Sequence, residues 1–141
     1  MRKEKISAVV VFLVIMVCMA SFFGVGSRLK YDFGDAELHV ICKEYQVAIT
    51  YADVNKLELV DVENYGIAVD GGSDRSYRWG EWENEQWGRY FQCTTVNTDY
   101  GISLETNDGT KYFFNYEGDR STEELYELFR NLLESKGYVI E

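Results

Sequence analysis

The longest hydrophobic run of the chain lies close to its N-terminus. From Ile6 through Ser27, 22 consecutive residues carry no formal charge, and most of them are Val, Ile, Leu, Met, Phe or Ala. A helix rises about 1.5 Å per residue, so this run is roughly 33 Å long as a helix and matches a hydrocarbon core about 30 Å thick. The pattern therefore predicts one transmembrane helix over residues 6–26, which would contact the lipid bilayer.

The charges beside this run predict its orientation. Three basic residues precede it within residues 1–5, and positive charge next to a span resists translocation. Arg28 and Lys30 follow it, but acidic residues come directly after them. We expect a single-pass protein of the cell membrane, with a cytoplasmic N-terminus and an extracytoplasmic C-terminal domain.

Two other interpretations of the same run stay open. A cleaved signal peptide also begins with basic residues, and Gly24 to Gly26 has the small-x-small character of a cleavage site. The apolar run is nevertheless longer than the usual core of about 7 to 15 residues. A lipoprotein signal fits less well, because Val17 stands before Cys18 where a small residue is expected. Both alternatives still export the domain.

Beyond the apolar run, short alternating segments are typical of β-strands. Residues 27–34 form a short polar and aromatic link, and we expect the folded domain over residues 35–141. Leu57 and Leu59 share one strand face, and the polar residues between them occupy the other. Residues 71–74 indicate a turn. The strands expected are 37–42, 46–50, 55–62, 63–70, 89–96, 100–106 and 111–116.

The last two of these strands should form a hairpin whose register can be derived. A two-residue turn at Asp108-Gly109 would mix apolar and polar faces, whereas a three-residue loop over 107–109 keeps them separate. Glycine as the third loop residue suits the left-handed conformation that closes such a loop. The pairs predicted by the three-residue loop are Leu104 with Tyr112, Ile102 with Phe114, and Glu105 with Lys111.

The chain ends in a segment with helical spacing. Ser121 and Glu124 fit a capping box, and Gly137 is placed to end the helix. Apolar residues at helical spacing give one stripe that consists of Leu125, Leu128, Phe129 and Leu132. Strands followed by one helix, with no proline, predict a mainly β (α+β) domain: an antiparallel sheet or small barrel closed by a terminal amphipathic helix.

Charge is divided unevenly along the chain and excludes one class of ligand. Residues 1–30 contain five Lys/Arg and one Glu, a net charge of +4, while residues 31–141 contain nine Lys/Arg and 23 Asp/Glu, a net charge of −14. Nucleic-acid binding normally depends on Lys and Arg, so we expect no nucleic acid as a partner. The acidity either keeps an exported domain soluble or attracts cations or a basic partner.

Several segments of the domain, taken in order, resemble the bacterial pleckstrin-homology-like (PH-like) domains. The segments are Ile49 to Val60, Trp87 to Phe91, Gly101 to Leu104, Thr106 to Phe114 and the helix from Ser121. The resemblance covers Asp35 to Lys136. It implies a bent sheet or small barrel of about seven strands, plugged by the C-terminal helix, in a domain often attached to a membrane span and without an assigned enzymatic activity.

The sequence departs from the lipid-binding members of this superfamily. Those domains bind phosphoinositides through a basic loop between their first two strands. The matching loop here is Cys42-Lys43-Glu44-Tyr45, in which one lysine is offset by one glutamate. We therefore expect no phosphoinositide ligand.

The residues suited to chemistry do not form a recognisable catalytic set. His39 is the only histidine, and Cys42, three positions later, falls on the opposite face of the same strand. Cys42 and Cys93 lack metal-ligand spacing, and whether they form a disulfide is left open. We expect no enzymatic activity and no cofactor, with a carboxylate-based cell-envelope hydrolase as a remote alternative.

The segment from residue 77 to residue 91 contains every tryptophan of the chain and supplies two candidate sites. The candidate interaction surface consists of Arg78, Trp79, Trp82, Trp87 and Arg89, residue types that concentrate binding energy. Alternatively, one or two of the tryptophans fill the end of the barrel. A less favoured cation-binding loop consists of Glu81, Glu83 and Glu85, whose alternative role is a solvated, charged edge.

These observations predict a membrane-anchored PH-like interaction module without catalytic activity, which presents an acidic extracytoplasmic domain to an envelope protein. The main alternative is a ligand or cation sensor that uses the segment from Trp79 to Trp87.

Overall fold

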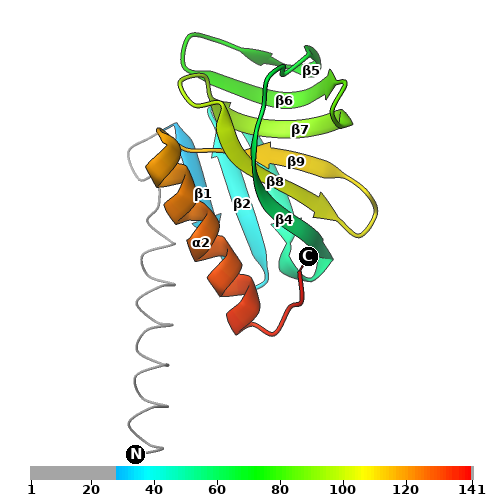
Figure 1. The fold of residues 1–141 in the computed structure, drawn as a ribbon, viewed down its shortest axis with the longest axis vertical. Coiled ribbons are helices and arrows are strands. Elements are labelled where there is room, and N and C mark those ends of the chain that lie inside the picture. Colours follow the sequence, from blue (N-terminus) through cyan, green and yellow to red (C-terminus); the bar gives the residue numbers. More distant parts are fainter. Residues whose placement is uncertain (1–27, 141) are drawn as a thin grey trace, which may run out of the picture.

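The computed structural model describes residues 28–140 of the 141-residue chain. This part of the chain contains nine strands, one short 3₁₀-helix and one α-helix (Figure 1). The strands are β1 (Leu29–Phe33), β2 (Glu37–Cys42), β3 (Tyr45–Thr50), β4 (Val54–Asp61), β5 (Ile67–Ser73), β6 (Tyr77–Asn84), β7 (Gly88–Thr95), β8 (Tyr100–Thr106) and β9 (Lys111–Phe114). The 3₁₀-helix η1 (Tyr51–Asp53) joins β3 to β4, and the helix α2 (Asp119–Ser135) ends the domain.

The strands form two sheets that are connected through η1. One sheet has the order β1-β2-β3, and the other has the order β4-β8-β9-β7-β6-β5. All neighbouring strands run antiparallel except β7 and β9, which are parallel. The mainly β, α+β class is confirmed. The expectation of about seven strands in an antiparallel sheet is wrong, because the described chain has nine strands and one parallel pair.

The parallel pair arises because the β8–β9 hairpin folds back over the turn that precedes it, so that β9 lies between β8 and β7. The buried side chain of Asn115, directly after β9, stabilises this arrangement. Its Oδ1 accepts a hydrogen bond from the Thr95 amide at 2.7 Å, and its Nδ2 donates to the Thr98 carbonyl at 2.7 Å. The Asn115 side chain thus supplies hydrogen-bond partners for the Thr95 amide and the Thr98 carbonyl, two buried backbone groups of the turn between β7 and β8.

The main hydrophobic core lies between the two sheets and α2. Strand β1 contributes Leu29, Tyr31 and Phe33 in strict alternation with exposed residues. The ring of Phe33 packs against that of Phe129 in α2, with centroids 5.6 Å apart. The expected link over residues 27–34 is therefore wrong for Leu29–Phe33, which is a strand whose inward side chains belong to the core.

A second, smaller hydrophobic cluster covers the other face of the six-stranded sheet. Val62, Trp82, Tyr90 and Phe113 are buried in it, and neighbouring aromatic side chains pack against them. Tyr65 is one of these neighbours, and its ring centroid lies 6.0 Å from that of Phe113. The central strands of this sheet are consequently covered on both faces, although the alternation in β4 predicted one wet face.

Three local predictions are confirmed. The strand over residues 37–42 has the expected bounds, and Val47 and Ile49 of β3 share the buried face. The β8–β9 hairpin has the predicted register, because Leu104 pairs with Tyr112, Ile102 with Phe114, and Glu105 with Lys111. Gly109 closes its loop at φ 86°, as the three-residue loop requires.

The prediction of a turn over residues 71–74 is wrong. Gly71 and Gly72 lie inside β5, opposite Gly80 and Trp79 of β6. A Cβ added at Gly71 would lie 2.2 Å from the Trp79 carbonyl oxygen, so glycine is required there by the close approach of two strands. The expected strand over residues 63–70 accordingly begins later, at Ile67. The segment from Trp79 to Trp87, expected to be a loop, is mostly the β6–β7 hairpin.

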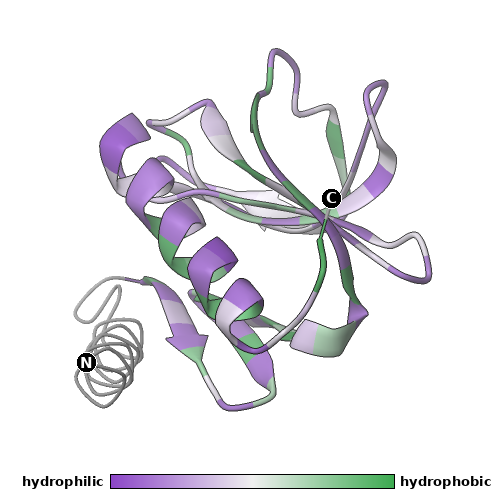
Figure 2. Ribbon diagram, turned by 60° about the horizontal axis from the view of Figure 1, so that its bottom comes forward, coloured by the Kyte–Doolittle hydropathy of each residue, from purple (hydrophilic) through white to green (hydrophobic). Residues whose placement is uncertain are grey.

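Helix α2 is confirmed, but its N-terminal cap differs from the prediction. The helix begins at Asp119, so Ser121 lies inside its first turn. The N-cap residue is Gly118, which has no side chain to cap the helix. The hydroxyl group of Thr122 is bonded to the backbone of Tyr116 instead. The apolar face of α2 is turned toward the strands (Figure 2). Gly137 ends the helix at φ 87°.

The predicted transmembrane helix over residues 6–26 lies outside the described residues. Within residues 28–140, no helix is both long enough and apolar enough to cross a membrane.

Candidate functional site

The structure does not bring the five residues of the candidate interaction surface together on one surface. Trp79 packs at the margin of the main core, whereas Trp82 and Trp87 belong to the cluster on the opposite face of the sheet. Trp82 is only 8% exposed, and its indole N–H donates to the Trp79 carbonyl at 3.0 Å. Strand alternation in β6 separates Trp79 from Trp82, because their side chains point to opposite faces.

The two arginines of that candidate surface are held by different partners. The guanidinium group of Arg78 lies 3.6 Å from the ring centroid of Tyr65. Arg89 lies near two carboxylates, with its Nη1 3.4 Å from Glu81 Oε1 and its Nε 3.7 Å from Glu83 Oε2. Arg78 therefore packs on the Tyr65 loop, while Arg89 partly neutralises the acidic face of β6.

Two of the three glutamates of the candidate cation-binding loop share one arginine, and the third lies in the neighbouring turn. Glu81 and Glu83 lie in β6 beside Arg89, and Glu85 lies in the turn between β6 and β7. No group of three or more His, Cys, Asp or Glu side chains in residues 28–140 is arranged to hold a metal ion.

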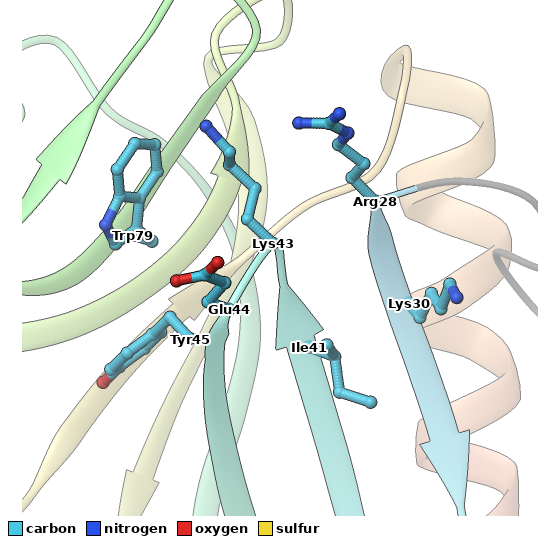
Figure 3. Close-up of a pocket in the computed structure, with 7 residues that line it drawn as sticks. All are labelled: Arg28, Lys30, Ile41, Lys43, Glu44, Tyr45 and Trp79. Atoms are coloured by element: carbon cyan, nitrogen blue, oxygen red, sulfur yellow. The ribbon is translucent and has the colours of Figure 1, made fainter.

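A pocket of about 580 Å³ lies where the β2–β3 turn meets β6. Trp79 and Tyr45 lie on one side of the Lys43 side chain, and Arg28 lies on the other (Figure 3). The residues that line the pocket are Arg28, Lys30, Ile41, Lys43, Glu44, Tyr45 and Trp79. Three of them are basic, so this pocket offers positive charge beside aromatic rings in an otherwise acidic domain.

Lys43 connects the two sheets at this pocket. Its Nζ lies 2.6 Å from Asp74 Oδ2 and 4.7 Å from the ring centroid of Trp79. The backbone of Lys43 has φ 58°, a left-handed conformation that is uncommon for a residue with a side chain. The hydrogen bond from Lys43 and those from the amides of Ser76 and Tyr77 lower the pKa of Asp74 to about 2.

Sequence reasoning singled out Trp79 but missed its neighbours. In the sequence, Arg28 and Lys30 follow the apolar run, and Lys43 lies in a loop where Glu44 offsets its charge. They meet because β1 and β2 are paired, so Lys30 lies opposite Ile41. Within residues 28–140, neither Arg28 nor Lys30 takes part in a salt bridge, and an anionic group in this pocket would gain two cations.

A second pocket, of about 260 Å³, lies between β3 and the β8–β9 turn. It is polar and contains Asp53 and Asp108. The Asp108 carboxylate accepts hydrogen bonds from the Thr106 hydroxyl group and from the Thr110 amide, and these bonds lower its pKa to about 2. Because its carboxylate is used to hold the hairpin loop, Asp108 is not poised to take up a proton near neutral pH.

The thiols and the histidine are occupied by structural contacts. Cys42 and Cys93 are free and buried in the main core. Burial raises the pKa of Cys42 to about 12 and that of Cys93 well above its ordinary value, so neither is a thiolate at neutral pH. His39 lies on the outer face of β2. Its Nε2 is 2.7 Å from Glu37 Oε1, and its Nδ1 is 2.8 Å from Gln46 Nε2.

The most exposed apolar strand of the domain is β5, which sequence reasoning did not select. Ile67 is 69% exposed and Val69 is 39% exposed, and β5 is the edge strand of the six-stranded sheet. The run Ile67-Ala68-Val69 was visible in the sequence, but the glycines that follow it suggested a turn.

Comparisons of this chain with protein-family models, with curated proteins and with solved structures found no match.

Proposed function

We propose that this chain is a membrane-anchored interaction module without catalytic activity, whose acidic domain binds an envelope protein outside the cytoplasm. The observation that carries the proposal is the edge strand β5, where Ile67 and Val69 leave apolar side chains in solvent beside an unpaired backbone edge. An exposed strand edge is a template for pairing with another chain. The anchor follows from the uncharged run over residues 6–26, and the orientation from the basic residues before it.

Photo-crosslinking in native membranes tests this proposal. A benzoylphenylalanine placed at Val69 of the full chain should form an adduct with one defined envelope protein, identified by mass spectrometry. The matched control is the same probe at Val139, which is 94% exposed and lies beyond α2. Equal adducts at both positions, or no adduct at Val69, would contradict the proposal.

We also propose a distant relation to the bacterial PH-like domains. In favour of it are the resembling segments, the run of strands and the terminal helix packed on the core. The nine strands of the described residues and the parallel pairing of β7 with β9 depart from what the resemblance implied. The relation therefore rests mainly on the segments 49–60 and 101–114.

A second candidate function is a sensor of a small ligand. The specific observation in its favour is the 580 Å³ pocket, which combines Arg28, Lys30 and Lys43 with the rings of Tyr45 and Trp79. Pockets of roughly 300–1,000 Å³ suit small molecules. A ligand bound to the folded state must raise the melting temperature. Melts that do not change across a panel of organic anions, glycans and Ca²⁺ would exclude this sensor.

A further inference from the structure

The free edge of β5 has the properties of a docking site for an extended segment. Strand β6 occupies only one side of β5, and the other side is the boundary of the sheet. Six of the seven β5 residues are exposed, and the only half-buried one is Gly72. Ile67 and Val69 are two of the three exposed large hydrophobic residues in the described chain. Exposed apolar residues scattered singly over a surface are ordinary, but here two of them lie two positions apart on one edge strand.

The composition of β5 is only partly explained by its own fold. Gly71 is required because β6 approaches closely, as the clash of an added Cβ with the Trp79 carbonyl indicates. The register between β5 and β6 shifts between Ala68 and Asp70, which leaves Val69 as an extra residue. Such a bulge protects an edge, and edges are usually protected further by lysine or proline. Neither is present in β5, where Ile67 and Val69 are both exposed.

Charge determines which occupant fits this edge. Asp61, Glu63 and Asp70 lie in or just before β5 and have no salt-bridge partner in the described part of the chain, whereas Asp74 is paired with Lys43 and is followed by Arg75. On the neighbouring strand, Glu81 and Glu83 share only Arg89 as a salt-bridge partner in the described part of the chain. A second copy would bring the same acidic edge against this one, and residues 31–141 carry a net charge of −14. A basic segment is attracted instead.

We infer that β5 binds a basic, extended segment of the envelope partner as an added strand. Backbone hydrogen bonds to the free edge would supply part of the affinity. Apolar side chains of the segment would cover Ile67 and Val69, and its Lys or Arg side chains would lie near Asp70 and the acidic face of β6. This inference rests on the proposed interaction function and specifies the partner's chemistry.

A pair of model peptides tests this chemistry. The full chain in phosphatidylcholine nanodiscs, which carry no net charge, is titrated with acetyl-Lys-Val-Lys-Ile-Lys-Val-amide and with the same peptide carrying Glu for Lys. We expect the basic peptide to bind at least about tenfold more tightly and to weaken as salt rises. Hydrogen exchange of the β5 amides should slow, while that of β1, one of the two edge strands of the other sheet, should not. Equal binding of both peptides, or slowing at β1 alone, would overturn the inference.

Two exposed substitutions give a matched pair for the same titration. Val69→Lys adds a positive charge at the proposed site and should weaken binding of the basic peptide by about tenfold. Val139→Lys adds the same charge to an exposed apolar position beyond α2 and should leave binding unchanged. Equal effects of the two substitutions would overturn the inference, because binding would then follow net charge alone.

The outcomes also separate this inference from the proposed function. An envelope protein that crosslinks at Val69 while neither peptide binds would leave the interaction function standing and refute the basic added strand. A crosslinked dimer of this chain at Val69 would refute the charge argument, because the occupant would be a second copy.

Discussion

The parallel packing of β9 against β7 is expected to depend on the amide group of Asn115. This side chain is fully buried and bonds to the Thr95 amide, to the Thr98 carbonyl at 2.7 Å, and to the Thr95 carbonyl at 3.4 Å. Thr95 and Thr98 are themselves almost fully buried. The substitution Asn115→Ala removes both ends of the amide and leaves buried backbone groups without their partners.

The cost of Asn115→Ala follows from the groups that lose their bonds. A buried donor or acceptor left unsatisfied costs about 1–3 kcal/mol. The Thr95 amide and the Thr98 carbonyl each lose a 2.7 Å bond, so the free energy of unfolding should fall by about 2–6 kcal/mol. Small domains have only about 5–15 kcal/mol in total. With roughly 4 °C lost per kcal/mol, the melting temperature should fall by at least about 8 °C.

The assay is thermal unfolding of the full chain in a mild nonionic detergent, followed by near-ultraviolet circular dichroism of the aromatic side chains. Asn97→Ala is the matched control, because Asn97 lies in the same turn but its side chain is exposed. Its melting temperature should stay within about 2 °C of that of the unchanged protein, as expected for a surface substitution. If Asn115→Ala melts as Asn97→Ala does, the side chain does not hold the turn and the argument fails.

Three further predictions concern the Lys43–Asp74 salt bridge, the two buried thiols and the arginine stacked on Tyr65. The pKa of Asp74 is lowered to about 2 from an ordinary value of about 3.9, so its stabilising contribution is complete above about pH 4 and is lost as pH falls toward 2. Asp74→Asn should reduce the slope of melting temperature against pH over that range, with Asp108 supplying part of what remains, and an unchanged slope would contradict this. With Cys18, the third cysteine, replaced by serine, Cys42 and Cys93 should react with Ellman's reagent at pH 8 only after unfolding in urea, because burial raises the pKa of both thiols. Fast reaction of the folded protein would contradict this prediction. Arg78→Ala should lower the free energy of unfolding, measured by urea titration, by about 0.5–2 kcal/mol, because the guanidinium group packs on the ring of Tyr65. The control Arg120→Ala, at a highly exposed position of α2, should change it by less than about 0.5 kcal/mol. Similar losses for both substitutions would refute the stacking argument.

Elements fixed by local chemistry were predictable from the sequence. The β8–β9 register follows from matching apolar faces across a short loop, and the pairs Leu104–Tyr112 and Glu105–Lys111 have the expected partners. The end of α2 at Gly137 follows from the left-handed conformation that glycine tolerates. In these cases the deciding interactions lie within a few residues of one another.

The candidate sites were less predictable because they depend on which strands become neighbours. The tryptophans were expected on one surface, but the two faces of β6 separate Trp79 from Trp82. The glycines at 71 and 72 were taken for a turn, because nothing nearby in the sequence indicates that β6 comes within contact of them. The pocket around Lys43 brings together residues as distant in the chain as Arg28 and Trp79.

By itself, the amino-acid sequence determined the mainly β class with its terminal helix, the acidic charge of the domain and the register of one hairpin. Only the tertiary structure decided that β9 pairs in parallel with β7, that Leu29–Phe33 belongs to the core and that β5 is left as a free apolar edge. The physical reason is that alternation and turn chemistry act over a few residues, whereas the order of strands in a sheet is set by packing between segments far apart in the chain.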